Sequence, residues 1–154
     1  KLKTGTVLNF AGAKQIEKEE LLELDVEVLY PAALENAIHS KNANKIKAKI
    51  VCELANGPTT PEADLILFKN GVHVIPDILG SAGGVVVSYF EMVQDKSLYF
   101  WEEEEVHKRL DKKMTLAYHR VKEAIKEKKV HPRLAAMLVG VARVAEACKL
   151  RGWV

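Results

Sequence analysis

Three short apolar stretches, each followed by a proline or a loop of small residues, divide the first half of the chain. Residues 25–30, 48–52 and 72–75 favour β-strands because they are rich in valine, isoleucine and leucine and end at turn-forming residues. Between them, residues 34–47 and 61–70 carry apolar side chains at helical spacing. Strands that alternate with helices through short connections indicate a parallel sheet with right-handed crossovers.

The helix expected over residues 61–70 has clear signals at both ends. Thr60 is a good N-cap residue, and Pro61 suits the first turn. Gly71 is placed to end the helix. Upstream of the first strand, residues 6–8 favour a further short strand, and residues 19–24 favour a short helix.

The second half of the chain is predicted to be helical. From Val106, apolar residues recur in steps of three and four at Leu110, Met114, Ala117, Val121 and Ala124. A last helix begins at Pro132, keeps the same spacing at Leu134, Leu138, Val141, Ala145 and Cys148, and ends at Gly152. For residues 83–93 the sequence does not decide between a strand and a helix. Their valines favour a strand, but a helix that starts at the glycines is equally allowed.

Length and charge limit the classes of function. A chain of 154 residues, 48% of them hydrophobic, supplies the core of one domain. Its formal charge of +2 indicates neither a nucleic-acid-binding surface nor an anionic membrane as partner. We find no apolar run of about 18 residues, which a membrane helix needs, and no signal-peptide pattern. Because the first residue is Lys1, we expect a piece of something longer.

Cysteine and histidine give no sign of a metal site. Cys52 and Cys148 have no metal or redox spacing, so we expect two buried free thiols and a reducing, cytoplasmic location. The five histidines are scattered, and no pair has the spacing of a helical zinc site.

The loops after the three strands are the candidate functional site. In an open parallel sheet, ligands bind beyond the carboxyl ends of the strands. Here those ends lead into residues 31–33, 55–61 and 76–84, which are rich in alanine, glycine, proline and serine. Small residues let a ligand approach the backbone, although the same residues also serve tight turns. No G-x-G-x-x-G fingerprint is present.

Sequence motifs at these loops resemble the C-terminal part of glutamate dehydrogenase, within the glutamate, leucine, phenylalanine and valine dehydrogenase family. The similarity covers essentially the whole chain, and the end of the chain resembles notably the archaeal and bacterial hexameric forms of the family. It rests on PAALEN at residues 31–36, ANGPTTPEAD at 55–64, PDIL at 76–79, AGGV at 82–85 and VSYFE at 87–91, with RVAEA and LRGW near the end.

This resemblance implies an α/β fold, in which the second half of a Rossmann-like parallel sheet is followed by long C-terminal helices. Residues 1–80 would be part of an NAD(P)-binding domain, and residues 81–154 would be helices that close the cleft. It also implies that residues 82–93 form a helix. The implied reaction is the reversible oxidative deamination of L-glutamate to 2-oxoglutarate and ammonia, with NAD or NADP taking the hydride.

By the same resemblance, six residues at the loops would bind the cofactor: Ala32, Ala33, Asn56, Ser81, Gly83 and Gly84. The two alanines would pass close to the nicotinamide ribose, and Asn56 would hydrogen-bond near the nicotinamide. Ser88 would help bind the side-chain carboxylate of the substrate, which favours glutamate over leucine, phenylalanine or valine. A helix hydroxyl such as that of Ser88 can instead bond to its own backbone.

Some features of the family are missing or changed. Its catalytic lysine and aspartate lie upstream, so we expect no catalytic residue here and no activity from the 154 residues alone. Family members usually have glycine where Leu54 stands, asparagine where Ser81 stands, tryptophan where Met92 stands and often threonine where Glu102 stands. Serine is shorter than asparagine, so the cofactor contact at residue 81 is in question.

Two alternatives to glutamate dehydrogenase stay open from the sequence. One is a non-catalytic remnant that serves as a binding or interaction module, which the changes at Leu54 and Ser81 favour. The other is a related leucine, phenylalanine or valine dehydrogenase. Because a truncated sheet exposes an unpaired edge, we further expect self-association or pairing with the missing N-terminal part.

Overall fold

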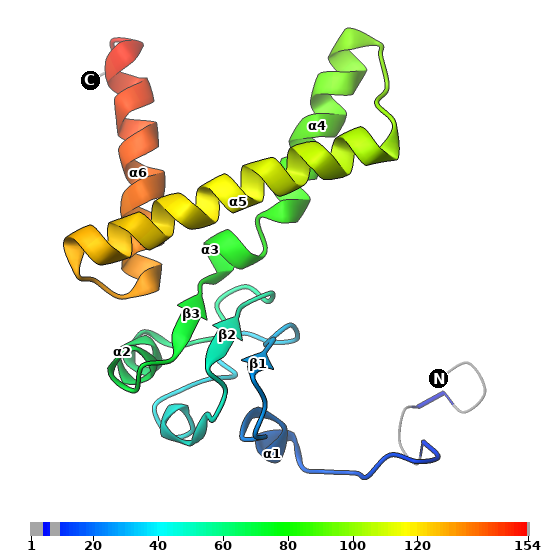
Figure 1. Cartoon of the computed structure of the whole chain (residues 1–154), viewed down its shortest axis with the longest axis vertical. Helices are drawn as coiled ribbons and strands as arrows, with labels where there is room; N and C mark the ends of the chain where they lie inside the picture. Colours follow the sequence, from blue (N-terminus) through cyan, green and yellow to red (C-terminus); the bar gives the residue numbers. More distant parts are fainter. Residues whose placement is uncertain (1–4, 7–9, 154) are drawn as a thin grey trace.

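The computed structural model describes residues 5–6 and 10–153 (Figure 1). The short strand expected at residues 6–8 falls largely on Val7 and Leu8, which lie outside the described residues. The first helix, α1 (Lys18–Leu22), lies close to the expected residues 19–24. Residues 23–27, which include a turn and two bends, connect it to the sheet.

The three expected strands form one parallel sheet. Strands β1 (Val28–Leu29), β2 (Ile50–Cys52) and β3 (His73–Ile75) lie side by side in the order β1-β2-β3. Leu29 pairs with Val51, which pairs with Val74. The strands are shorter than the apolar stretches that predicted them, but the parallel arrangement is confirmed.

Helix α2 (Pro61–Lys69) follows the predicted end signals. The Thr60 side chain accepts a hydrogen bond from the Ala63 N–H at 3.3 Å, which satisfies one of the unpaired donors of the first turn. Gly71, just beyond the helix, has a φ of +75°, a conformation that favours glycine.

The helix expected over residues 34–47 is wrong. Only a short 3-10 helix, η1 (Ala43–Lys45), forms there. The backbone N–H groups of Asn36 and Ile38 donate instead to the carbonyl oxygens of Gly57 and Pro58, both at 2.8 Å. The segment is irregular because its backbone forms hydrogen bonds with the loop after β2 and not within a helix. Its apolar side chain at Ile38 is buried in the core.

The hydrophobic core of this half lies between the sheet, α2 and the irregular segment. Ile38, Val51 and Leu67 are fully buried, and each comes from a different one of these parts. Packing of this kind holds together a sheet whose strands have only two or three residues.

Helices dominate the chain after β3. The short α3 (Asp77–Gly80) leads into α4 (Gly83–Ser97), α5 (Glu103–Lys128) and α6 (Pro132–Leu150). The open question at residues 83–93 is therefore settled in favour of a helix. Leu98 and Lys129 end α4 and α5 in the left-handed conformation, and in Figure 1 α4 and α6 extend from α5 as two prongs.

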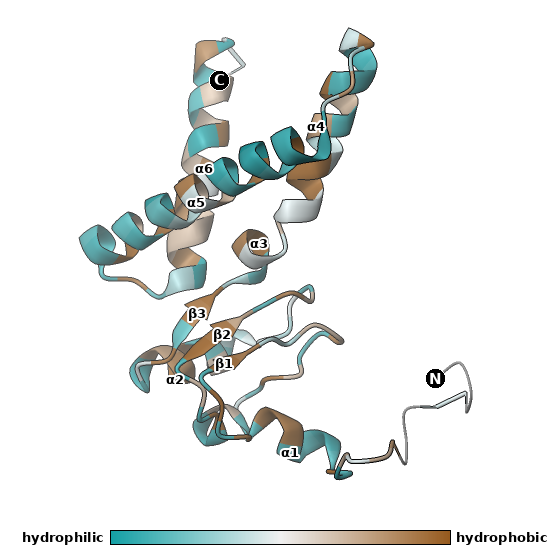
Figure 2. Ribbon diagram, turned by 45° about the vertical axis from the view of Figure 1, so that its right-hand side comes forward, coloured by the Kyte–Doolittle hydropathy of each residue, from teal (hydrophilic) through white to brown (hydrophobic). Residues whose placement is uncertain are grey.

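A second core joins the helices to the sheet, but it is small. Leu79, Val121, Ala135 and Ala136 form its buried part. Farther along, α6 leaves the core, so Val141 and Val144 are 67% and 65% exposed. Figure 2 shows apolar residues along α4 and α6 as well as in the sheet. A parallel sheet followed by long helices confirms the expected fold class.

Candidate functional site

Backbone contacts bring the first two strand-end loops together. The Pro31 carbonyl oxygen, just after β1, accepts hydrogen bonds from the N–H groups of Leu54 at 3.1 Å and Ala55 at 2.9 Å. The non-glycine residues with positive φ in the described chain are Asn36, Leu98 and Lys129. Leu54 therefore has an ordinary backbone conformation, and its position does not require the glycine that is usual in the family.

A carboxylate brings the third loop to the same edge. Oδ2 of Asp77, the first residue of α3, accepts a hydrogen bond from the Gly57 N–H at 2.8 Å. Gly80 lies so close to the end of β2 that an added Cβ would be 2.4 Å from the Glu53 carbonyl oxygen. All three loops thus meet at the carboxyl edge of the sheet.

Three of the expected cofactor-binding residues lie exposed on the first two loops. Ala32 follows the Pro31 anchor directly, and Ala33 comes next. Asn56 lies between Ala55 and Gly57, both of which are anchored through their N–H groups. The Asn56 side chain makes no hydrogen bond with the part of the chain that the structure describes, so its amide is free to bind a ligand.

Ser81 is exposed at the turn between α3 and α4, and its hydroxyl donates to the Asp77 carbonyl oxygen at 2.7 Å. This bond holds the hydroxyl against the backbone of α3. The serine therefore does not extend outward as a longer amide side chain would.

The other three expected site residues lie on α4. Gly83 and Gly84 start the helix, where the first N–H groups have no partner within it. No atom lies within 4 Å of a Cβ added to Gly84, so this side of the helix is open. Ser88 is exposed and lies four residues later, on the same face one turn along.

Behind these loops lies an ion cluster that the sequence analysis did not predict. The guanidinium of Arg133, at the start of α6, donates to Glu53 Oε1 at 2.6 Å, to Asp77 Oδ1 at 2.8 Å and to Asp64 Oδ1 at 3.1 Å, and its Nε also bonds to Asp64. The side chain of Arg133 is only 14% exposed, and that of Glu53 is fully buried. The cluster joins α6 to the end of β2, to α2 and to α3.

Two opposing effects act on the pKa of Arg133. Burial by itself lowers this pKa, but hydrogen bonds to Asp64 and Glu53 and their negative charges outweigh it and raise the pKa above its ordinary value. The guanidinium is therefore a permanent cation. The sequence held two signals of the cluster: a glutamate directly after an apolar strand, and an arginine in a first helical turn, where the helix dipole disfavours it.

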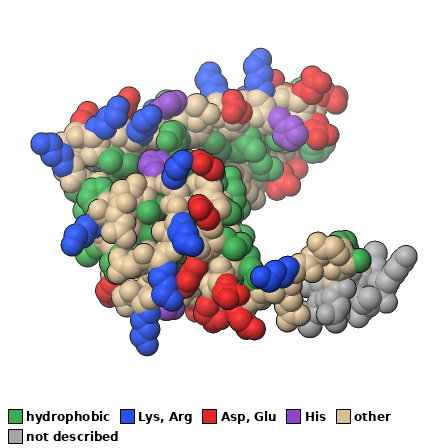
Figure 3. Space-filling model, turned by 60° about the horizontal axis from the view of Figure 1, so that its bottom comes forward, with side chains coloured by type: hydrophobic (Ala, Val, Ile, Leu, Met, Phe, Trp, Pro, Cys, Tyr) green, Lys and Arg blue, Asp and Glu red, His purple; other side chains and the backbone are tan. Residues whose placement is uncertain are grey.

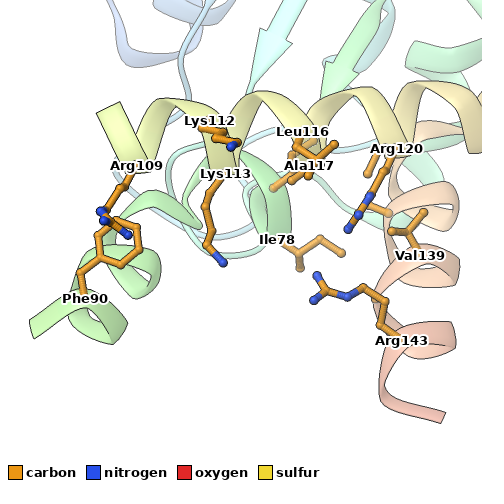
Figure 4. Close-up of a pocket in the computed structure, with 14 residues that line it drawn as sticks. Ile78, Phe90, Arg109, Lys112, Lys113, Leu116, Ala117, Arg120, Val139 and Arg143 are labelled. Carbon is orange, nitrogen blue, oxygen red and sulfur yellow. The ribbon is translucent and has the colours of Figure 1, made fainter. Parts of the chain in front are cut away.

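A separate cavity of about 730 Å³ lies among α3, α4, α5 and α6. Its lining combines apolar residues such as Ile78, Leu116 and Val139 with lysines and arginines. Figure 4 shows Lys113, Arg120 and Arg143 extending into this space. None of the seven expected site residues lines it. The candidate site is thus the sheet edge, and the cavity belongs to the face between the two prongs.

Neither the surface charge nor the two cysteines indicate a further reactive site among the described residues. The face in Figure 3 carries lysine and arginine beside aspartate and glutamate. Across residues 5–6 and 10–153 no group of three or more metal-ligating side chains is placed to hold a metal ion, and no helix has the length and apolarity to cross a membrane. Both cysteines are free but half-buried, not buried as expected. Burial, and next the charge of Glu53, raise the pKa of the Cys52 thiol.

The fold places the chain among open α/β proteins with a parallel sheet, a class whose ligand sites lie at the edge where these loops meet. The profile of the Glutamate/Leucine/Phenylalanine/Valine dehydrogenase family matches residues 1–152, and the chain belongs to that family. It is 53% identical over 148 residues to glutamate dehydrogenase of Thermotoga maritima, and 50% identical over 149 residues to NAD-specific glutamate dehydrogenase of Staphylococcus aureus. These alignments cover 96% and 97% of the chain but 36% of each relative.

Solved structures agree with this assignment. Hetero-hexameric glutamate dehydrogenase from Thermus thermophilus, in its leucine-bound form, superposes with a TM-score of 0.87 at 33% identity, over 97% of this chain and 35% of that one. Glutamate dehydrogenase from Peptoniphilus asaccharolyticus gives 0.77 at 45% identity, over 81% and 32%. The expected resemblance and the Rossmann-like fold are confirmed, and the chain spans about a third of the length of these relatives.

Proposed function

We propose that this chain is the C-terminal part of an NAD(P)-dependent glutamate dehydrogenase. The observation that carries the proposal is the meeting of three loops at one sheet edge. The amide of Asn56 is unpaired on one of these loops, and Ala32 is exposed on the loop that bonds to it through Pro31. In this assignment residues 1–80 are part of the cofactor-binding domain, and residues 81–154 are the helices that close the cleft. The reaction would convert L-glutamate to 2-oxoglutarate and ammonia in the cytoplasm.

The described residues fit a nicotinamide cofactor, NAD or NADP. Ala32 and Ala33 give a side-chain-poor path beside β1, and the amide of Asn56 is free to donate and to accept. Gly84 leaves open space, and the first turn of α4 has N–H groups without helical partners. When bound, the nicotinamide supplies the acceptor for the hydride.

The remaining work of this chain would be positioning. Ser88 lies on the open side of α4, one turn from Gly84, where its hydroxyl would donate to the side-chain carboxylate of glutamate. Ser81 would line the turn between the cofactor and the substrate, with its hydroxyl bonded to Asp77. The groups that move protons would come from the part of the protein equivalent to the rest of the relatives.

We also propose that this other part, or a second copy, covers the exposed apolar residues of α4 and α6. Val85 on α4 is 75% exposed, and Val141 on α6 is 67% exposed. Apolar surface of this extent favours association. Sedimentation of the 154-residue chain should show self-association, and a clean monomer at high concentration would contradict this point.

The test is an assay of the complete reading frame that contains this chain, beside the 154 residues alone. The complete polypeptide should reduce NAD or NADP only when L-glutamate is present, and the 154 residues should not. Failure of the complete polypeptide with both cofactors would end the proposal. Turnover by the 154 residues alone would show that we have misplaced the catalytic groups.

Substitution of two serines on α4, one at a time, tests whether the substrate is L-glutamate. Ser88→Ala should lower kcat/KM for L-glutamate by about tenfold, because a hydrogen bond to a charged group is lost. Ser97→Ala is the matched control, since the Ser97 hydroxyl bonds to the Gln94 carbonyl oxygen at the far end of the helix. Faster turnover of L-leucine than of L-glutamate by the unmodified protein would refute the role of Ser88.

A further inference from the structure

Asp77 connects the candidate cofactor loop to the last helix. One carboxylate oxygen, Oδ2, accepts the Gly57 N–H, and the other, Oδ1, accepts from Arg133 Nη1, both at 2.8 Å. Its own N–H donates to Glu53 Oε2 at 2.8 Å. The side chain of Asp77 is 15% exposed, so its position is set mainly by these partners.

Three hydrogen bonds hold Ala55 and Gly57, the residues on either side of Asn56. Two are backbone bonds, from Ala55 N to the Pro31 carbonyl oxygen and from Asn36 N to the Gly57 carbonyl oxygen. The third is the bond from the Gly57 N–H to Asp77. It is the one of these three that a side chain supplies, and it lies next to the peptide unit of Asn56.

Arg133 fixes the carboxylate of Asp77 in turn. The guanidinium and the Ile78 N–H, which also donates at 2.8 Å, both hold Oδ1 and leave Oδ2 directed at Gly57. Glu53 and Asp64 hold the guanidinium from its other sides. The chain of contacts therefore runs from α6, through Asp77, to the loop.

We infer that Asp77, held by Arg133, is a positioning residue that sets the orientation of Asn56 toward the nicotinamide end of the cofactor. This inference rests on the proposed function and names a residue for which the family resemblance implied no role. It predicts that a change at Asp77 weakens cofactor binding more than substrate binding. The same loss of charge elsewhere in the cluster should not do so.

Asp64 provides the matched control. It also bonds to Arg133 and is 4% exposed, but it lies on α2 and makes no side-chain hydrogen bond to the 55–57 loop. Asp77→Asn and Asp64→Asn each remove one negative charge from the same guanidinium. Both should lower the melting temperature, so stability alone does not separate the two variants.

In the complete polypeptide, Asp77→Asn should raise KM for the nicotinamide cofactor by about tenfold, the loss of one charge-assisted hydrogen bond, and KM for L-glutamate by less than about twofold. Asp64→Asn should leave both KM values within about twofold. In the 154-residue chain, amide exchange at Gly57 should be faster in Asp77→Asn than in Asp64→Asn. Asp77→Glu keeps the charge but displaces the carboxylate, so it should also raise KM for the cofactor. This variant replaces Asp77→Asn in the test if Asp77→Asn does not fold.

Equal cofactor KM values in the two asparagine variants, or unchanged exchange at Gly57 in Asp77→Asn, would overturn the inference. These outcomes are distinct from failure of the proposed function. In that case the unmodified complete polypeptide itself would show no glutamate-dependent reduction of NAD or NADP, whatever happens at Gly57.

Discussion

The sheet half and the helical half of this chain reach order in different ways. Strands of two or three residues are held because Ile38, Val51 and Leu67 pack into a fully buried core around them. In contrast, α6 has 19 residues and buries only Pro132, Ala135 and Ala136, all in its first turn and a half. Long helices persist with little burial because their backbone hydrogen bonds are internal, whereas short strands depend on their neighbours.

This difference separates a half that buries its own apolar residues from a half that leaves many of them exposed. The sheet half has its own core, but the prongs formed by α4 and α6 carry apolar surface that nothing in the described chain covers. The two halves are joined by Arg133 and by the small core at Val121. Substitutions in the two halves should therefore have unequal effects, and the junction should be the most sensitive point.

The largest effect is expected at the junction. Arg133→Met would leave three carboxylates without their cation and should lower the free energy of unfolding by about 3–5 kcal/mol. Arg109→Met is the control, because the Arg109–Glu105 pair on α5 is exposed and should cost at most about 1 kcal/mol. Urea unfolding measures both, and equal losses would show that the cluster does not join the halves.

A truncation in each half tests the difference in burial. Leu67→Ala in α2 empties a fully buried position and should cost about 2–5 kcal/mol. Val141→Ala in α6 should stay within about 0.5 kcal/mol, because its side chain is 67% exposed. Thermal unfolding of the 154-residue chain gives both values. A large loss from Val141→Ala would mean that α6 is already covered, by self-association.

Alanine substitutions at two glycines should change stability by smaller amounts and in opposite directions. Gly80→Ala would place a Cβ 2.4 Å from the Glu53 carbonyl oxygen and should destabilise the chain by about 1–3 kcal/mol. Gly140→Ala adds a Cβ in α6 with no atom within 4 Å and should stabilise it by about 0.5–1 kcal/mol. Unfolding midpoints in urea compare the two, and a loss at Gly140 would contradict the open position of α6.

The smallest effect is a pH dependence where β3 meets α5. Burial, and next the charge of Lys122, hold the pKa of His73 below its ordinary value of 6.5, and the Tyr118 hydroxyl lies 3.3 Å from His73 Nε2. As pH falls below 6.5, the unfolded chain binds the proton first, so stability should fall through the lower folded pKa.

Melting temperatures of the unmodified chain and of His73→Gln, measured from about pH 7.5 to about pH 5.5, test this dependence. The variant should lose less stability on acidification because it lacks the group that titrates. Lys122→Met should lie between the two, since it removes the second cause of the lowered pKa. Parallel curves for all three proteins would show that His73 does not contribute.

Much of the fold could be predicted from local signals. The end signals at Thr60 and Gly71 predicted α2 to within one residue, and the period of three and four from Val106 to Ala124 predicted the middle of α5. Both signals depend on residues that are close together in the chain. The segment 34–47 was misread because its apolar residues face a core built by α2 and the sheet. Its backbone N–H groups donate to the carbonyl oxygens of Gly57 and Pro58, and no local sequence pattern predicts these distant partners.

The candidate site divides in the same way. The loops could be found because strands in a parallel sheet deliver their carboxyl ends to one edge, and motif resemblance supplied the residues on them. The Arg133 cluster could not be located, since its members are up to 80 residues apart in the chain. Each is an ordinary charged residue until the fold removes it from water.

By itself, the amino-acid sequence determined the family, the order of strands and helices, and the small-residue loops, because these depend on short-range propensity and on motifs. Only the tertiary structure decided that residues 34–47 are irregular, that Ser81 bonds to Asp77 and that one arginine is shared by three carboxylates. The physical reason is that buried hydrogen bonds and ion pairs depend on which distant groups lose water together.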